Sequence, residues 1–336
     1  MTISVVTPIG LAIDRTKHIL FRPFEIGKWF LLGFCAWLAT LGEGGGSGFG
    51  SQWKSGGRGG GPGSVRSMLG WIEANTALVV ALVIAGLIVV VGLSALVLWL
   101  QSRGQFMFLD GVVHNRGVVV EPWRALRRLG NSLFGFSFVL TIFGLLSFVL
   151  ILAICVVVAW SDIQANTFGN RALAGTIAGV VLLATAGLTF GVITLLLHDF
   201  VVPAMYLRDV DVMSAWTMVH TEVLAGRMST IVMYCFMKFV LALGIGGLAI
   251  ALTCATCCIT AVPYIGTVIL LPLLVFGRCY SLYFLEQYGP AWRCFADDGW
   301  PPRCRRCGYD LRGNVSGACP ECGAPIHGLD PPPPDA

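Results

Sequence analysis

The sequence predicts an all-α polytopic membrane protein with six transmembrane helices. Of its 336 residues, 56% are hydrophobic and only 12% are charged, whereas about 25% of the residues in an ordinary soluble domain carry a charge. The mean hydropathy is +0.79, and six apolar stretches approach or exceed the roughly 20 residues that cross a bilayer as a helix. Because so few charges cannot cover a soluble globule of this length, the composition excludes a soluble enzyme, a disordered chain and a secreted disulfide scaffold.

The six predicted spans comprise residues 26–41, 77–100, 133–160, 174–197, 239–259 and 263–285. In the longer stretches apolar residues surround the helix instead of forming one stripe, which is typical of a membrane span. The first span is short and follows Asp14, Arg15 and Lys17. No small-residue cleavage site closes it, so we expect it to be retained and not removed as a signal peptide.

Two basic residues test the boundaries of the last two spans. Counting the fifth span from residue 229 would bury Lys238 in the middle of the helix, at a cost of about 2.5–3.5 kcal/mol. We therefore begin this span near Phe239, which leaves Lys238 at the interface, where its stem can snorkel. Arg278 lies within the sixth span, and we expect it to snorkel from there as well.

The distribution of basic residues predicts the orientation in the membrane. All but four of the 22 Lys and Arg residues fall on the side that carries both termini, and the four exceptions are Lys54, Arg58, Arg66 and Arg171. Because cytoplasmic segments are enriched in Lys and Arg, we expect both termini in the cytoplasm, which agrees with an even number of spans. We therefore assign the chain to the bacterial cytoplasmic (inner) membrane as a multi-pass protein.

Amphipathic stretches precede the first, third and fifth spans, at residues 11–23, 122–131 and 215–227. In the second stretch three arginines share one helical face, and Trp123, Leu126 and Leu129 lie toward the other. Such a helix would lie in the headgroup plane, and a solvated basic loop is the alternative. Aromatic runs followed by a charge end the second, fourth and sixth spans, which indicates either three copies of one unit or the general preference of an interface for such residues.

Three further segments separate or follow the predicted domains. Residues 43–64 are mostly glycine and serine and lack the Gly-Lys-Ser/Thr pattern of a phosphate-binding loop, so we expect a flexible outer linker. Residues 291–302 link the membrane domain, residues 1–290, to a cysteine-containing motif. Residues 327–336 form a proline-rich tail that we expect to be extended.

The motif at residues 303–326 contains two Cys-x2-Cys pairs, each followed by glycine, with eleven residues between the pairs. A two-residue gap lets one tight turn direct two thiolates at one ion, and the glycine permits a positive φ after it. Four thiolates select zinc, or iron in a rubredoxin-like site, over magnesium or calcium, and we favour zinc. The predicted ligands are Cys304, Cys307, Cys319 and Cys322. Four ligands fill the tetrahedral coordination of zinc, so the site should be structural and not hydrolytic.

The sequence Cys-x2-Cys-Gly-Tyr-Asp-Leu-Arg-Gly, followed by Cys-Pro-Glu-Cys-Gly, resembles the rubredoxin-type zinc ribbons of many uncharacterised planctomycete proteins. The resemblance covers residues 303–325 and implies the same four cysteines as ligands, but no activity. The membrane part is similar to uncharacterised bacterial six-span proteins. Through Arg22-Pro23-Phe24, residues 199–203 and Tyr206, it also loosely resembles the membrane domain attached to some glycerophosphodiester phosphodiesterases. The chain has no room for their catalytic domain, so no hydrolase is implied.

No catalytic constellation is evident, because the sequence contains no Gly-x-Ser-x-Gly and no His-Glu-x2-His motif. His198 and Asp199 end the fourth span and could serve proton transfer. Because they lie near the inner interface, we favour instead their hydration or their pairing with Arg208, Lys238 or Arg278.

These observations favour a non-enzymatic scaffold or accessory protein, which contacts the lipid bilayer and, through its ribbon, a protein partner. Asp310 and Glu321 dilute the basic patch of the ribbon, which disfavours nucleic acid as a partner. The alternative is a transporter or permease-like protein with a site among its spans.

Overall fold

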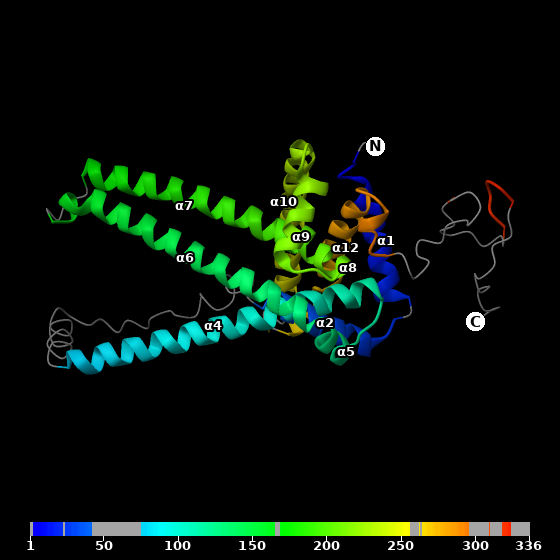
Figure 1. Cartoon of the computed structure of the whole chain (residues 1–336), viewed down its shortest axis with the longest axis horizontal. Helices are drawn as coiled ribbons and strands as arrows, with labels where there is room; N and C mark the ends of the chain where they lie inside the picture. Colours follow the sequence, from blue (N-terminus) through cyan, green and yellow to red (C-terminus); the bar gives the residue numbers. More distant parts are fainter. Residues whose placement is uncertain are drawn as a thin grey trace.

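The structure is a computed structural model that describes residues 3–22, 24–41, 75–164, 169–255, 262, 264–295, 309 and 318–323. Most of these residues are helical (Figure 1). In chain order the helices are α1 (Thr7–Phe21), α2 (Ile26–Thr40), α4 (Thr76–Val113), α5 (Val120–Ala125), α6 (Arg127–Gln164), α7 (Asn170–Leu196), the π-helix η2 (Leu197–Val201), α8 (Val202–Arg208), α9 (Val212–Met218), the π-helix η3 (Val219–Leu224), α10 (Met228–Ala255), α11 (Ile265–Ile269), α12 (Leu271–Glu286) and the 3-10 turn η5 (Pro290–Trp292).

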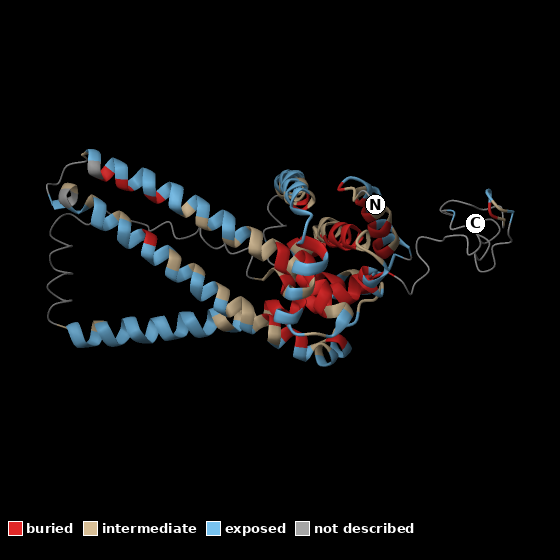
Figure 2. Cartoon of the chain, turned by 45° about the horizontal axis from the view of Figure 1, so that its top comes forward, coloured by how far each residue is buried: buried red, intermediate tan, exposed pale blue. Residues whose placement is uncertain are grey.

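Buried residues concentrate in one part of the molecule, which we call the head (Figure 2). The head comprises α1, α2, residues 101–113 of α4, η2, α8, α9 and α12. The remaining parts of α4, α6 and α7 extend from it as three long arms (Figures 1 and 2). Every residue of α4 from Gln101 to Val113 is buried, whereas Leu87 is 61% exposed and Ile88 is 66% exposed. Exposing so much apolar surface to water is unfavourable, so the surface of the arms is suited to the hydrocarbon layer of a membrane.

Four helices of the described residues are long and apolar enough to cross a membrane, namely Thr76–Val113, Arg127–Trp160, Ala172–Arg208 and Met228–Ala255. They contain or overlap the second, third, fourth and fifth predicted spans, so the helical architecture is confirmed, and the length and composition of these helices support a membrane protein. The first predicted span corresponds to α2, which has 15 residues. The segment predicted as the sixth span is divided into α11 and α12 around Leu270. The total of six spans therefore stays a prediction.

α2 and α12 both pack within the head. Residues 28–39 of α2 lie against Gly104 and Gly111 of α4 and against Gly117 in the connection that follows it. The contact is closest at Gly104, where an added Cβ would lie 2.5 Å from the backbone nitrogen of Ala39, so only glycine fits there. All eight residues from Arg278 to Leu285 in α12 are buried, and this helix packs against α1. The apolar character of these two segments thus serves a protein core.

α10 leaves the head in a different direction from the three arms (Figures 1 and 2). The helix begins at Met228, after Gly226, whose φ of +72° is a conformation that glycine adopts without strain. Lys238 therefore lies inside α10 and not ahead of it, in contrast to the prediction. Its charge is accommodated there because it pairs with Asp199, as described below.

The three predicted amphipathic stretches are all largely helical. They correspond to α1, to α5 with the start of α6, and to α9 with η3. In the second, Arg124, Arg127 and Arg128 are exposed, whereas Leu129 is buried, as the amphipathic pattern predicts. α1 differs, because Arg15 is fully buried and lies over the ring of Phe295, with 4.4 Å between its Cζ atom and the ring centroid.

Candidate functional site

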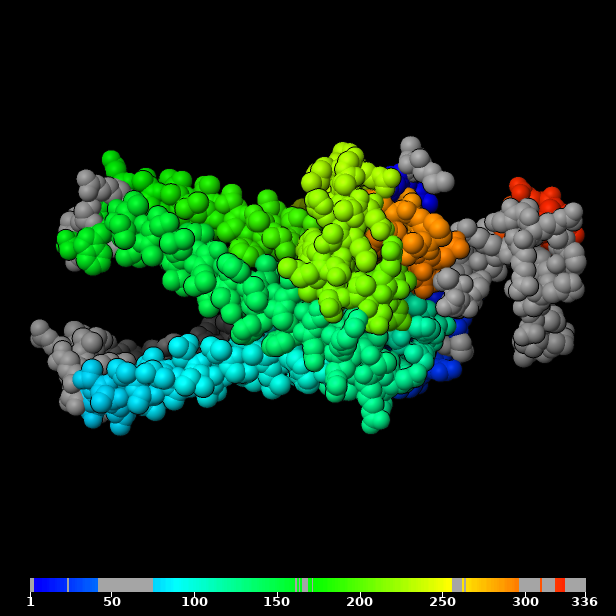
Figure 3. Space-filling model, in the orientation of Figure 1, coloured from blue at the N-terminus to red at the C-terminus, as the bar shows by residue number. Residues whose placement is uncertain are grey.

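A small cavity lies where α4 and α6 meet the end of α7 and η2. Its volume is about 140 Å³. In the space-filling view, the arms α4 and α6–α7 separate from one another as they leave this junction (Figure 3). Four apolar residues and seven polar residues line the cavity, and the polar ones are Gln101, Ser102, Gln105, Ser137, Thr141, Thr194 and His198. The cavity thus presents hydrogen-bonding groups at the place where the apolar arms begin to separate.

Some of these polar groups are engaged within the protein. Gln105 donates from Nε2 to the carbonyl oxygen of Ala39 at 2.9 Å, which ties α4 to α2. The hydroxyl groups of Ser102 and Thr141 donate to carbonyl oxygens four residues earlier in their own helices, both at 2.8 Å. These bonds satisfy the donors but leave hydroxyl lone pairs on the cavity wall.

Other polar groups of the lining have no such contact. The side chains of Gln101, Ser137 and Thr194 form no hydrogen bond with any residue that the structure describes. Gln101 is only 8% exposed, and its carboxamide atoms keep accessible surface where the residue lines the cavity. Its amide can therefore hydrogen-bond to whatever occupies the cavity, because it has both donor and acceptor capacity.

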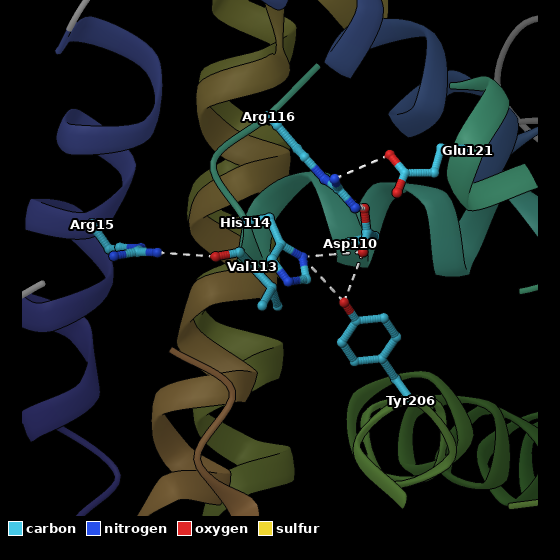
Figure 4. A network of polar contacts seen from close by, with 7 residues as sticks. All are labelled: Arg15, Asp110, Val113, His114, Arg116, Glu121 and Tyr206. Atoms are coloured by element: carbon cyan, nitrogen blue, oxygen red, sulfur yellow. Dashed lines mark hydrogen bonds and ion pairs between the residues drawn. The ribbon is translucent and has the colours of Figure 1, made fainter. Parts of the chain in front are cut away.

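A polar network surrounds Asp110 at the end of α4 (Figure 4). The buried carboxylate accepts a hydrogen bond from the Tyr206 hydroxyl at 2.8 Å and two from Arg116, at 3.2 and 3.3 Å. His114 Nδ1 lies 3.1 Å from the same carboxylate. Arg116 also contacts Glu121 at 3.2 Å, so the network connects α4, α5 and α8. Since the carboxylate is fully committed to neighbouring groups, its evident effect is to hold these helices together.

A second network surrounds Asp199 in η2. Its carboxylate accepts a hydrogen bond from Tyr234 at 2.9 Å and lies 3.1 Å from the ammonium group of Lys238. Arg278 donates to the carbonyl oxygen of His198 at 2.7 Å. The interpretation that Asp199 pairs with a neighbouring cation is therefore confirmed, whereas the Arg278 bond reaches the backbone of His198 and not its imidazole. These contacts join η2 to α10 and α12, and the rings of Tyr234 and Phe284 pack beside them with centroids 4.3 Å apart.

The π-helical geometry of η2 has a local cause. Pro203 has no backbone N–H, so the carbonyl oxygen of Asp199 cannot receive the bond that an α-helix would provide. The backbone widens instead, and the N–H of Val202 donates to Leu197, five residues earlier. π-helical turns often occur at functional sites, and this one places His198 on the wall of the cavity and Asp199 in the network behind it.

Only half of the predicted metal site can be described. Cys304 and Cys307 lie outside the described residues. Cys319 is buried and Cys322 is half-buried, and the N–H of Gly323 donates to the carbonyl oxygen of Cys319 at 2.9 Å. Gly323 has the positive φ, +66°, that we expected after the second pair. Among the described residues no three His, Cys, Asp or Glu side chains are grouped to hold a metal, so the zinc site stays a prediction.

Sequence reasoning missed the cavity and the Asp110 network. Asp110 and Tyr206 are 96 residues apart, and no periodicity connects them. The predicted second span ends at residue 100, so Gln101 to Gln105 received no role. A signal was present, since polar residues also occur at the matching ends of the third and fourth spans, at Ser137, Thr141 and Thr194.

Comparison with known proteins places the chain in one family. Residues 3–285 match the family of unknown function DUF7544, and because the match covers most of the chain, the protein belongs to this family. No curated protein and no solved structure matches the chain.

Proposed function

Starting from membership of a family whose function is unknown, we propose that the protein is a non-enzymatic scaffold or accessory protein of the bacterial cytoplasmic membrane. In this proposal it has six spans, both termini lie in the cytoplasm, and a zinc-bearing tail contacts a protein partner. The observation that carries the proposal is the head, in which buried charges connect helices to one another. The network around Asp110 connects α4, α5 and α8, and the network around Asp199 and His198 connects η2, α10 and α12, which suits a rigid platform.

The positions of the basic residues support the orientation. α1, the last part of α4, α5, the start of α6 and α8 all belong to the end of the molecule from which the arms extend, and they carry Arg15, Lys17, Arg103, Arg124, Arg127, Arg128 and Arg208. Arg171 lies at the start of α7, at the far end of an arm. Because Lys and Arg mark the cytoplasmic side, the head faces the cytoplasm.

The tail supplies the partner-binding element of the proposal. Cys304, Cys307, Cys319 and Cys322 would hold zinc, which would order a segment too short to build its own core. A cytoplasmic tail lies in a reducing compartment, so thiolates and not disulfides are expected there.

Affinity capture from mild detergent tests the scaffold role. Three forms would be compared as bait: the full chain, a chain ending before Arg303, and the Cys304→Ser/Cys307→Ser variant. A Cys254→Ser variant is the matched control, because Cys254 is exposed on α10, far along the chain from the ribbon. We expect the same partner with the full chain and the control, and its loss from the other two. Recovery of identical proteins by all four would refute the role of the ribbon.

One observation favours the alternative of a transporter, namely the polar cavity at the base of the arms. Neither Asp199 nor Arg278 lines it, so it lacks the membrane-embedded charges of an ion pathway. A Ser137→Cys variant tests the alternative with a membrane-impermeant thiol reagent applied to each side of sealed vesicles. Modification from both sides would favour transport over the scaffold role, and modification from neither or only one side would favour the scaffold.

A further inference from the structure

The cavity between α4, α6 and η2 has the properties of a binding site for one end of an amphipathic molecule. Its polar wall contains the carboxamide of Gln101, which is more than nine-tenths buried and has no hydrogen-bond partner in the described part of the chain. The hydroxyl groups of Ser137 and Thr194 face the same space from α6 and α7 without a partner among the described residues. Three helices thus direct donors and acceptors at one point.

The lining selects for an uncharged group. It contains amide, hydroxyl and imidazole groups, and no Lys, Arg, Asp or Glu side chain among the described residues. A phosphate or an ammonium group would enter this space without an opposite charge, at a cost of several kcal/mol. A hydroxyl or ester carbonyl group would instead exchange hydrogen bonds with Gln101. The volume of about 140 Å³ exceeds that of several water-sized probe spheres, so a glycerol-sized group fits.

The approach to the cavity is apolar. The arm of α4 exposes Leu87 and Ile88, and the facing arm of α6 exposes Leu145 and Leu146. The two arms separate as they leave the junction (Figure 3), so an alkyl chain attached to a group in the cavity would lie between apolar surfaces. Polar groups at the closed end and apolar walls at the open end match the two parts of a neutral lipid.

We propose that this cavity binds the uncharged, hydroxyl-bearing head of a membrane lipid such as a diacylglycerol, with the acyl chains lying between α4 and α6. Gln101 provides the main hydrogen bonds, and Ser137 and Thr194 assist from the opposite walls. The proposal depends on the arms being in lipid, but it does not depend on the scaffold role, because capture of a partner by the ribbon involves a different part of the chain.

Photolabelling of the full chain in lipid nanodiscs tests the proposal, with a 1,2-dioleoylglycerol analogue that carries a diazirine in one acyl chain. We expect cross-links in peptides from α4 and α6 that flank the cavity. Gln101→Leu, which keeps the approximate size but removes the amide, should reduce labelling roughly tenfold, the value of one buried hydrogen bond. Thr194→Val and Thr189→Val provide a matched pair, since both lie on α7 but only Thr194 lines the cavity. Labelling should fall for the first and remain unchanged for the second.

Competition distinguishes the sources of the head group. Excess unlabelled dioleoylglycerol should abolish the cross-links, whereas excess dioleoylphosphatidylglycerol or free glycerol should not. Competition by phosphatidylglycerol would overturn the selection for an uncharged head, and competition by glycerol would overturn the requirement for acyl chains. Equal labelling of wild type, Gln101→Leu and Thr194→Val would overturn the site itself. Should Gln101→Leu fail to elute as a monodisperse protein, Ser137→Ala replaces it in the same comparison.

Discussion

Lys238 and Asp199 form an ion pair that crosses from α10 to η2, and removing the lysine should destabilise the head strongly. The ammonium and carboxylate groups are 3.1 Å apart, and the two side chains are only 18% and 9% exposed. In Lys238→Met the stem is retained but Asp199 keeps only the hydroxyl of Tyr234 as a partner. Breaking a buried pair costs about 3–5 kcal/mol. Because Lys238 retains some exposure, we expect about 3 kcal/mol.

The free energy of unfolding can be measured by titrating the detergent-solubilised protein with a denaturant and following the fluorescence of its ten tryptophans. Asp199→Asn, Lys238→Met and the double variant form a cycle. The double variant should be more stable than Lys238→Met alone by about 1–2 kcal/mol, because no uncompensated charge remains in it. The exposed pair Arg128–Asp209 serves as the control, and Arg128→Met should cost less than about 1 kcal/mol. Additive losses in the cycle would refute a direct interaction between the two charges.

Three further predictions concern packing, thiol chemistry and metal. Gly104→Ala should destabilise by about 1–3 kcal/mol in the same titration, because its Cβ would meet the backbone of α2, whereas Gly92→Ala, with open space around it, should be neutral or stabilising; equal effects would contradict the close contact. Burial raises the pKa of the Cys294 thiol to about 12. Iodoacetamide at pH 8 should therefore alkylate it on the order of a thousandfold more slowly in the folded protein than in denaturant, by mass spectrometry. The stability that this thiol contributes should be complete below pH 9 and be lost as the pH rises toward 12. The purified protein should contain about one zinc per chain by elemental analysis and lose it in Cys304→Ser/Cys307→Ser; an unchanged zinc content in this variant would refute the ligand assignment.

The membrane class and the long helices follow from composition and length. Residues 77–100, residues 133–160 and the described part of the fifth predicted span, residues 239–255, lie inside α4, α6 and α10, because a continuous apolar run leaves the backbone no lower-energy arrangement in lipid than a helix. Helix ends were less predictable. α4 continues for 13 residues past Leu100, since the polar run after Leu100 enters a protein core and not water.

Two apolar segments show why the site was harder to predict. Residues 263–285 are apolar enough for a span, yet α12 is buried against α1. Hydropathy measures the aversion of a side chain to water and does not distinguish lipid from protein as its surroundings. The cavity could not be predicted from the sequence for a related reason. A single polar residue is common at the end of a span, and the site is defined only by the convergence of three such residues in the fold, namely Gln101, Ser137 and Thr194.

The unbroken course of α4 has a mechanical consequence. With 38 residues it is a rod of about 57 Å, which is nearly twice the roughly 30 Å thickness of the hydrocarbon layer. Since no hinge interrupts it at Gln101, a change in tilt at its outer end must turn the packed residues at its inner end by the same angle. Bilayer thickness and the geometry of the head are therefore coupled through a single piece of backbone.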